Sequence, residues 1–253
     1  MRFFNLAMWW AGQVPLLCLG YRAVRRGLFR EYPYFFGYLS SVLCATAVRI
    51  YLLPTTSQTY FVGFWISEFV SAVAGFGVTW EIYSHVLEPY RGVRRMARAV
   101  LGFLLVAVFA EATVGSSADR AGALVPATVE LERNLRVVQA LLLLAMTGLI
   151  VYYAIAIGRN IRFMLIGYGL YIGCAVIGLS MRAQWGEAFN APWQSIQKLA
   201  WDVTAVIWCM GLWSYSGNPV PDTSLECDYD RISQNTIRAL GRLRSHVTQS
   251  WRV

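Results

Sequence analysis

Seven long apolar segments, separated by short polar stretches, occupy the chain from its start to about residue 215. A helix that crosses a bilayer needs about 20 apolar residues, because the hydrocarbon core is about 30 Å thick and each residue rises about 1.5 Å. The composition agrees, since 57% of the residues are hydrophobic and 14% are charged, whereas a soluble domain carries about a quarter charged residues. We predict an all-α polytopic membrane protein with seven transmembrane helices at Phe3–Tyr21, Tyr34–Leu53, Tyr60–Ser84, Ala99–Val114, Val137–Ile157, Phe163–Met181 and Trp193–Tyr215. The alternative is six spans, with the first segment lying on the membrane surface.

The distribution of basic residues predicts the orientation, because arginine and lysine next to a span resist translocation. Most of them lie in the first, third and fifth loops between the predicted spans and in the tail: Arg22, Arg25, Arg26, Arg30, Arg91, Arg94, Arg95, Arg98, Arg159, Arg162, Arg231, Arg238, Arg242, Arg244 and Arg252. Fewer lie on the other side: Arg2, Arg120, Arg133, Arg136, Arg182 and Lys198. The N-terminus is therefore expected outside and the C-terminus in the cytoplasm. The net charge of +8 then serves topology and attraction to the anionic lipid of the cytoplasmic leaflet, and we expect no nucleic-acid partner.

We expect two parts: a seven-helix transmembrane domain over residues 1–216 and a cytoplasmic tail over 217–253. Between them, Ser216-Gly217-Asn218-Pro219-Val220-Pro221 ends the last helix, since proline cannot continue it. The tail is predicted to form a basic amphipathic helix with one apolar stripe: Ile232, Thr236, Leu240, Leu243, Val247 and Trp251. Such a helix lies on the lipid surface or docks a partner protein. The longest external loop is expected from Glu111 to about Glu132, as a connector or a lid.

A weak internal repeat appears at an offset of 130 residues. Gly37-Tyr38 then aligns with Gly167-Tyr168, and Cys44-Ala45 aligns with Cys174-Ala175. The identities are few enough to arise by chance, but both halves keep the same spacing and orientation. A 3+1+3 arrangement, with two parallel three-helix repeats joined by one helix, would produce this pattern.

Ionisable side chains inside a span are costly unless they are paired or hydrated, so each is a candidate functional residue. Four gather toward the predicted outer half of the bundle and together carry no net charge: Arg49, Glu68, Lys198 and Asp202. We expect these four side chains to interact, with Glu68 paired to Lys198. On the fifth span, Glu132, Arg136 and Gln139 share a face that continues inward. These residues predict an outward-facing polar cluster able to bind a small ligand. The alternative is that Arg49 and Lys198 extend to the outer interface and the carboxylates only neutralise them.

A second cluster lies at the inner end of the third span, where Glu81 and His85 are one turn apart. That spacing suits a metal or a proton relay, but the chain has only one other histidine, and pairing of the cluster with Arg94 or Arg95 is the preferred interpretation. The five cysteines have no metal or disulfide spacing. We therefore expect no metal and no cofactor.

One stretch resembles a known group of sequences. It runs through Glu68-Phe69-Val70, Trp80-Glu81-Ile82 and Glu88-Pro89-Tyr90-Arg91 to Leu131-Glu132-Arg133-Asn134-Leu135-Arg136. This pattern resembles uncharacterised seven-helix integral membrane proteins from bacterial genomes, best over spans three to five. The resemblance implies a seven-helix membrane protein and no particular activity. The excess of arginine over lysine and the absence of an Asn-x-Ser/Thr sequon favour a bacterial inner (plasma) membrane.

Several functions fit these features. A sensor or receptor-like protein that signals to the cytoplasm is the preferred one, because an outer polar cluster and a cytoplasmic tail are joined by one bundle. A small-solute transporter built from three-helix repeats is the alternative, and a structural subunit of a larger membrane complex is another. A retinal protein is disfavoured, because Lys198 lies near the end of its span. The chain contains no nucleophile elbow and no zinc motif, so an enzyme is also disfavoured.

Overall fold

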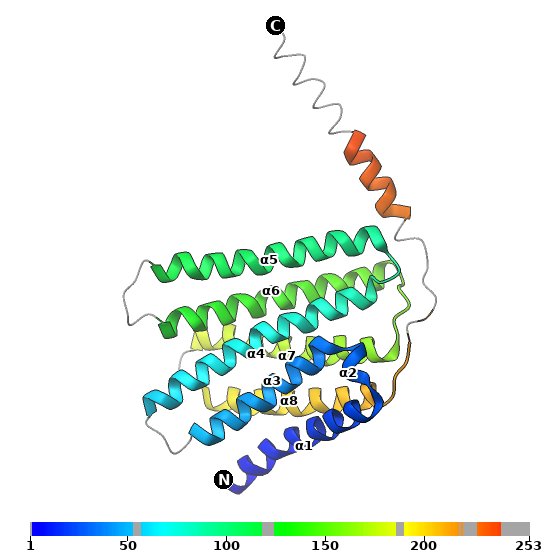
Figure 1. Ribbon diagram of the computed structural model, residues 1–253. Helices are drawn as coiled ribbons and strands as arrows, with labels where there is room; N and C mark the ends of the chain where they lie inside the picture. Colours follow the sequence, from blue (N-terminus) through cyan, green and yellow to red (C-terminus); the bar gives the residue numbers. More distant parts are fainter. Residues whose placement is uncertain are drawn as a thin grey trace.

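The computed structural model describes residues 2–52, 57–117, 124–185, 190–217, 219 and 227–238, and these residues form helices joined by short loops (Figure 1). The helices are α1 (Arg2–Arg26), α2 (Leu28–Glu31), α3 (Pro33–Leu52), α4 (Ser57–Val86), α5 (Arg91–Ser117), α6 (Leu124–Tyr152), α7 (Arg159–Trp185) and α8 (Asn190–Leu212). A further helical segment covers residues 227–238 of the tail. The predicted all-α class is confirmed for this part of the chain.

Seven of these helices are long, and each contains all or most of one predicted span. By length and composition alone, three stretches within the described residues are apolar enough to cross a bilayer: Pro33–Leu52, Arg133–Tyr152 and Arg159–Gly178. Most of the long helices extend beyond the predicted spans, but the fifth and seventh predicted spans run past the ends of their helices. The fifth span was expected to end at Ile157 but α6 ends at Tyr152, where Ala154 adopts a positive φ of 48°. The seventh was expected to reach Tyr215, but α8 ends at Leu212.

The predicted loop from Glu111 to Glu132 is mostly helical. Helix α5 continues to Ser117 and α6 already begins at Leu124, so the connection shrinks to residues 118–123, which lie outside the described residues. Pro126 lies in the first turn of α6, where a proline is tolerated, and the turns of both helices extend into the segment. The prediction of one long external loop from Glu111 to Glu132, as a connector or a lid, is therefore wrong.

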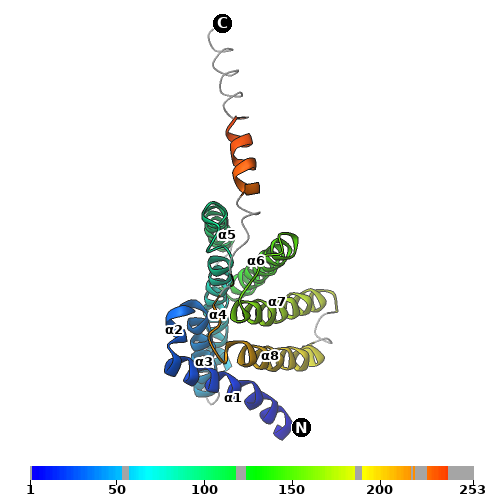
Figure 2. The same ribbon diagram turned by 90° about the vertical axis from the view of Figure 1, so that its right-hand side faces the viewer.

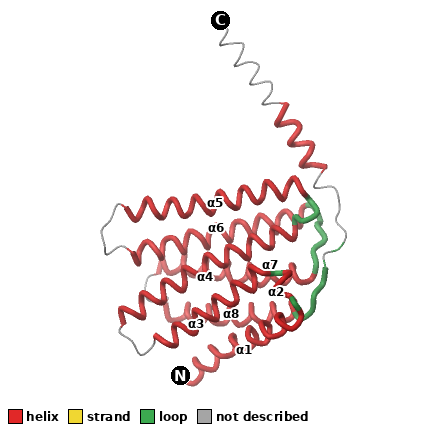
Figure 3. The backbone as a smooth tube through the Cα atoms, viewed as in Figure 1, coloured by secondary structure: helices red, strands yellow, loops and turns green. Residues whose placement is uncertain are grey.

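The long helices pack side by side in an antiparallel bundle. Helix α4 lies between α3 and α6, α7 packs on α6 and α8, and α1 closes the sequence by packing on α8 and α3. Helix α5 lies outside this group against α4 and α6, as the end-on view shows (Figure 2). The described loop residues that follow α4, α6 and α8 lie at one end of the bundle (Figure 3). The arginine-rich helix ends are at that same end.

Two of these arginines hold the end of α8 in place. The Nε of Arg22 donates a hydrogen bond of 2.6 Å to the carbonyl of Trp213, and its guanidinium lies 4.0 Å from the centre of that indole ring. Arg159 donates to the carbonyl and hydroxyl of Ser214. The last carbonyls of a helix lack partners within it and carry a partial negative charge, so cations stabilise them. These arginines therefore also have a structural role at the end of the bundle.

The largest buried cluster is aromatic and aliphatic and lies between α1, α3, α4, α6, α7 and α8. Its largest fully buried side chains include Trp208, Tyr168 and Phe35. Many large apolar side chains on the periphery are instead exposed, for example Phe103, Leu144 and Val151. Apolar side chains thus lie on both faces of the helices.

The beginning of the tail contacts the bundle. Tyr229 packs so closely on Gly92, at the start of α5, that a Cβ there would overlap its ring. Tyr153 donates a hydrogen bond of 3.5 Å to Asp228, which also forms an ion pair of 2.7 Å with Arg231. Ile232 and Ile237 remain exposed. Residues 227–238 of the tail are helical, and the rest of the predicted apolar stripe lies outside the described residues.

Candidate functional site

The predicted outer cluster begins with Arg49 in the last turn of α3. Its Nε and one terminal nitrogen donate to the hydroxyl of Ser67 on α4, at 3.1 and 3.0 Å, and its guanidinium lies 4.6 Å from the centre of the Phe64 ring. Ser67 directly precedes Glu68, whose side chain lies outside the described residues. The arginine therefore joins α3 to α4 at the predicted depth, through a serine that the sequence analysis did not single out.

Lys198 and Asp202 lie one turn apart on α8, and both side chains are partly buried. Asp202 lies against α1: a Cβ added at Gly12 would overlap its carboxylate, so this glycine gives the aspartate room. Beside it, Gln13 is buried, and its carbonyl oxygen has no hydrogen-bond partner within the described residues. The structure thus adds α1 to the polar region. The predicted pairing of Glu68 with Lys198 lies outside the described side chains and stays a prediction.

The two residues predicted on the fifth span are deeply placed on α6. Gln139 is fully buried; its amide nitrogen donates to the carbonyl of Ala72 on α4 at 2.9 Å, and its oxygen accepts from the Tyr168 hydroxyl on α7 at 3.3 Å. Arg136 is 4% exposed and its guanidinium lies 5.5 Å from the centre of the Tyr171 ring. A single glutamine therefore connects three helices. Glu132, predicted on the same face, lies outside the described side chains.

A row of aromatic rings connects this polar region to the bundle core. Tyr171 meets Trp201 edge-on at 5.1 Å between ring centres, and Trp201 meets Trp208 at 5.9 Å. Trp208 then contacts Tyr38 at 6.3 Å, and Tyr38 contacts Tyr168 at 5.7 Å. Such edge-to-face pairs stabilise packing beyond their buried area. Trp201 and Trp208 on α8 are therefore packing residues in this structure, and Trp208 is fully buried.

The inner cluster has a different role from the one predicted. The two carboxylate oxygens of Glu81 accept the backbone N–H groups of Tyr34 at 3.1 Å and Phe35 at 2.8 Å. These are among the first N–H groups of α3, which have no partner within their own helix. Glu81 is 2% exposed, so it caps α3 from a neighbouring helix. The preferred pairing of this carboxylate with Arg94 or Arg95 is not the arrangement that these hydrogen bonds describe.

His85 lies one turn beyond Glu81, as its spacing required. Its Nδ1 is 3.0 Å from the backbone carbonyl oxygen of Glu81, and its ring lies 5.2 Å from that of Tyr32. Burial raises the pKa of the Tyr32 phenol, with further contributions from Tyr215, Glu31 and Glu81. Among the described residues, no group of three or more histidine, cysteine, aspartate or glutamate side chains is arranged to hold a metal.

Sequence reasoning missed the cap, although one signal was present. Helix α3 begins at Pro33 and is preceded by Tyr32, so no serine, threonine, aspartate or asparagine occupies the capping position. A helix that begins without such a residue needs an acceptor from elsewhere. The carboxylate that supplies it, Glu81, is on α4, and the sequence alone does not reveal that α4 lies there.

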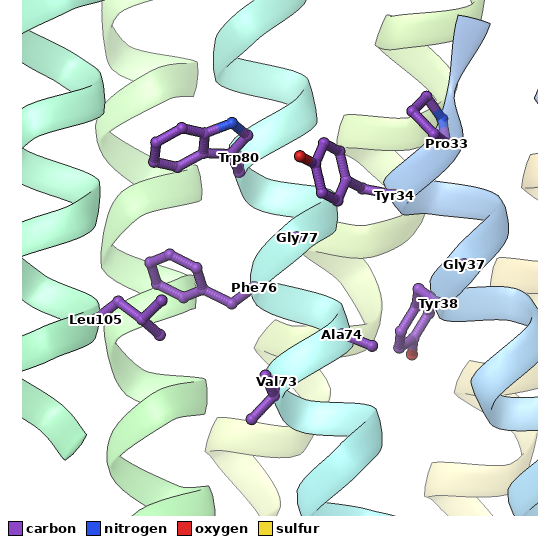
Figure 4. Close-up of a pocket in the computed structure, with 10 residues that line it drawn as sticks. All are labelled: Pro33, Tyr34, Gly37, Tyr38, Val73, Ala74, Phe76, Gly77, Trp80 and Leu105. Atoms are coloured by element: carbon purple, nitrogen blue, oxygen red, sulfur yellow. The ribbon is translucent and has the colours of Figure 1, made fainter. Parts of the chain in front are cut away.

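The structure also contains a cavity that no sequence motif indicated. It has a volume of about 370 Å³ and lies between α3, α4 and α5. Its walls are mostly aromatic and aliphatic, and its floor carries small residues (Figure 4): Pro33, Tyr34, Gly37, Tyr38, Val73, Ala74, Phe76, Gly77, Trp80 and Leu105. Trp80 and Phe76 point from α4 toward α5, whereas Tyr34 and Tyr38 approach from α3. Helices α3 and α5 both pack on α4 but not on each other, so the cavity over α4 opens between them to the outside of the bundle.

Comparisons with known proteins give no further guide to this site. No family model, no curated protein and no solved structure matches the chain.

Proposed function

We propose that all seven long helices cross a membrane. The support is their surface: Phe103, Val106, Leu144 and Val151 are each at least two-thirds exposed on the outer faces of α5 and α6. In water, such a belt of apolar side chains would promote association. In a bilayer the same side chains contact lipid, and the backbone polar groups are satisfied within each helix.

The arginine-rich end of this bundle faces the cytoplasm, and the membrane is a bacterial plasma membrane. Labelling of Cys227, which is exposed at the start of the tail helix, tests the orientation. The other cysteines are first replaced by serine: Cys18, Cys44, Cys174 and Cys209. A membrane-impermeant maleimide should label Cys227 only after the cells are permeabilised. Labelling of intact cells would reject the orientation.

Within this bundle, the protein acts as a receptor-like sensor. The observation that carries this proposal is the course of α8. It bears Lys198 and Asp202 near one end and the buried Trp208 further along, and the Arg22 contact with Trp213 follows directly after its end. One continuous helix therefore connects the polar region to the segment that leads into the tail. A ligand that shifts α8 by a fraction of a turn would alter the tail contacts, as in helix shifts of known switches.

A small-solute transporter is the second candidate, and the register of helix packing favours it. Thr204 on α8 donates to the carbonyl of Gly167 on α7 at 3.3 Å. At the offset of 130 residues, the corresponding Ala74 and Gly37 line the same cavity. Tyr38 and Tyr168, which are also equivalent, contact each other, as residues next to a pseudo-twofold axis would. Parallel repeats of this kind are frequent in carriers, which bind substrate between the repeats.

The packing of the outer helices shows the same correspondence between the two repeats. Helix α1 packs on α8, and α6, its equivalent in the second repeat, packs on α4, the equivalent of α8. Near the inner end, Glu81 meets the start of α3, and Gly211 at the corresponding position packs closely on Phe163 near the start of α7. These correspondences support the 3+1+3 repeat.

A ligand screen by thermal shift on detergent-purified protein tests binding at the outer cluster. Variants Asp202→Asn and Glu68→Gln are run beside the wild type, with Glu88→Gln as a control, because Glu88 is exposed and lies at the other end of α4. A ligand should raise the unfolding temperature of the wild type and of the control but not of the cluster variants, since binding to the native state stabilises it. A ligand that stabilises all four proteins equally would refute the proposed site.

Two further measurements separate sensing from transport. A sensor should change the labelling rate of Cys227 when the ligand is added, without uptake of the ligand into proteoliposomes. Uptake at an unchanged labelling rate would favour the transporter. A double-mutant cycle on Glu68 and Lys198 checks the predicted pair, and the absence of any coupling in stability would reject it.

A further inference from the structure

The cavity between α3, α4 and α5 opens toward the periphery of the bundle. Tyr34 at its rim is 54% exposed, and Gly37 and Ala74 form part of its lining. A Cβ at Gly37 would meet nothing within 4 Å, so this glycine leaves space that no other side chain fills. An apolar cavity that opens at the side of a membrane-spanning bundle faces lipid.

Arginines follow the same face of α5 toward its start. Arg91, Arg98 and Leu105 are seven residues apart, which places them on one side of the helix. Leu105 lines the cavity, so Arg98 lies about 10 Å nearer to the helix start and Arg91 about 20 Å nearer. Arg95 lies on the same side, and all three arginines are exposed. Trp80 lines the cavity toward this end, consistent with the preference of tryptophan for the membrane interface.

We propose that this cavity is a binding site for one anionic phospholipid. An acyl chain lies along Phe76, Leu105 and Gly37, and the phosphate is held by Arg91, Arg95 and Arg98 at the start of α5. The N-terminal end of that helix adds positive potential at the headgroup position. This inference rests on the proposed membrane-spanning bundle and its cytoplasmic arginine end, but not on the ligand at the outer cluster.

Charge decides between a lipid and a second copy of the chain as the occupant. A second copy related by twofold symmetry would bring the arginines of both molecules toward one another, and like charges across an interface oppose association. A phospholipid with a negative headgroup neutralises them. Its acyl chain also suits walls that combine aromatic rings with a floor of glycine and alanine.

Native mass spectrometry of the full chain in detergent measures this site directly. The two probes are phosphatidylglycerol and phosphatidylcholine with identical acyl chains, titrated separately. The wild type should bind one molecule of phosphatidylglycerol more tightly than any further molecule, and more tightly than phosphatidylcholine. Equal affinity for the two lipids, or binding without a preferred first molecule, would overturn the proposal.

Two sets of variants assign the site. Arg91→Gln/Arg95→Gln/Arg98→Gln should weaken phosphatidylglycerol binding by about fivefold for each arginine and remove the preference over phosphatidylcholine. The matched control, Arg25→Gln/Arg26→Gln/Arg162→Gln, removes the same charge from exposed arginines at the same end of the bundle and should leave the preferred molecule bound. An equal effect of both triple variants would show a diffuse charge effect and refute the site.

A larger side chain that fills the cavity tests its role. Gly37→Leu should weaken the binding of both lipids at this site. Gly148→Leu on α6 is the control, since it is also exposed and a Cβ there also meets nothing within 4 Å. Unfolding temperatures confirm that both variants fold. If Gly37→Leu instead changed the oligomeric state and left lipid binding intact, the cavity would bind a second copy of the chain, and the proposal would be wrong.

The outcomes also distinguish this inference from the proposed function. Labelling of Cys227 in intact cells would reject the orientation while leaving a measured lipid preference standing. Loss of the lipid preference with correct labelling would reject the lipid site alone.

Discussion

The cap that Glu81 provides for α3 gives the most direct test of the structure. Removing the side chain with Glu81→Ala leaves the N–H groups of Tyr34 and Phe35 without their acceptors. Hydrogen bonds to a charged group contribute about 1.5–3 kcal/mol each. The Tyr34 side chain is largely exposed, so water has access near that end, whereas Phe35 is fully buried and its N–H remains unsatisfied. We expect a loss of about 2–4 kcal/mol in the free energy of unfolding.

The variant Glu81→Gln should lie between the wild type and Glu81→Ala. Its one amide oxygen can still accept one N–H, but its NH₂ group faces the other donor. The assay is reversible unfolding in mixed micelles, followed by circular dichroism, with Glu88→Ala as a control because Glu88 is exposed. A change below about 0.5 kcal/mol in both Glu81 variants would refute the capping argument. A metal at this position would instead make the unfolding temperature sensitive to a chelator.

Two more predictions follow from close packing and from burial. At Gly178 a Cβ would overlap the Trp193 ring, so Gly178→Ala should lower the free energy of unfolding by about 1–3 kcal/mol; Gly20→Ala, with nothing within 4 Å, should be neutral or stabilising in the same denaturation assay. Burial raises the pKa of Tyr32, so the folded state retains this proton more strongly than the unfolded state. The stability that this provides is complete below about pH 10, where an unfolded tyrosine ionises, and falls as the pH rises above it. Tyr32→Phe should reduce that fall relative to the exposed Tyr21→Phe, and an equal pH dependence of both variants would contradict it.

The positions of the helices were predictable because they depend on local properties. A run of about 20 apolar residues predicts a helix of membrane length from its own composition, and each of the seven runs coincides largely with one long helix. The ends were less predictable. The segment from Glu111 to Glu132 looked like a loop because of its glycine and serine residues and Pro126, yet helical turns extend into it from both sides. Short polar residues disfavour a helix weakly, and neighbouring turns can override them.

The candidate site was predicted only in part. Gln139 and Arg136 were recognised because polar side chains in an apolar run are unusual, and both are buried. Their partners were not recognised, since Ala72 contributes a backbone carbonyl and Tyr168 is an ordinary aromatic residue of a span. The contact of Asp202 with α1 at Gly12 depends on how two distant helices pack, which no local pattern records.

The sequence by itself determined the helical class, the approximate extent of each long helix and the gathering of arginines near alternate helix ends, because hydropathy and charge act residue by residue along the chain. Only the tertiary structure decided that Glu81 caps α3, that Trp208 packs among rings from other helices, and that a cavity remains open between α3, α4 and α5. These features arise from pairs of residues far apart in the chain. Their contacts depend on which helices become neighbours and on the rotation of each about its axis, and many packings satisfy the same apolar pattern.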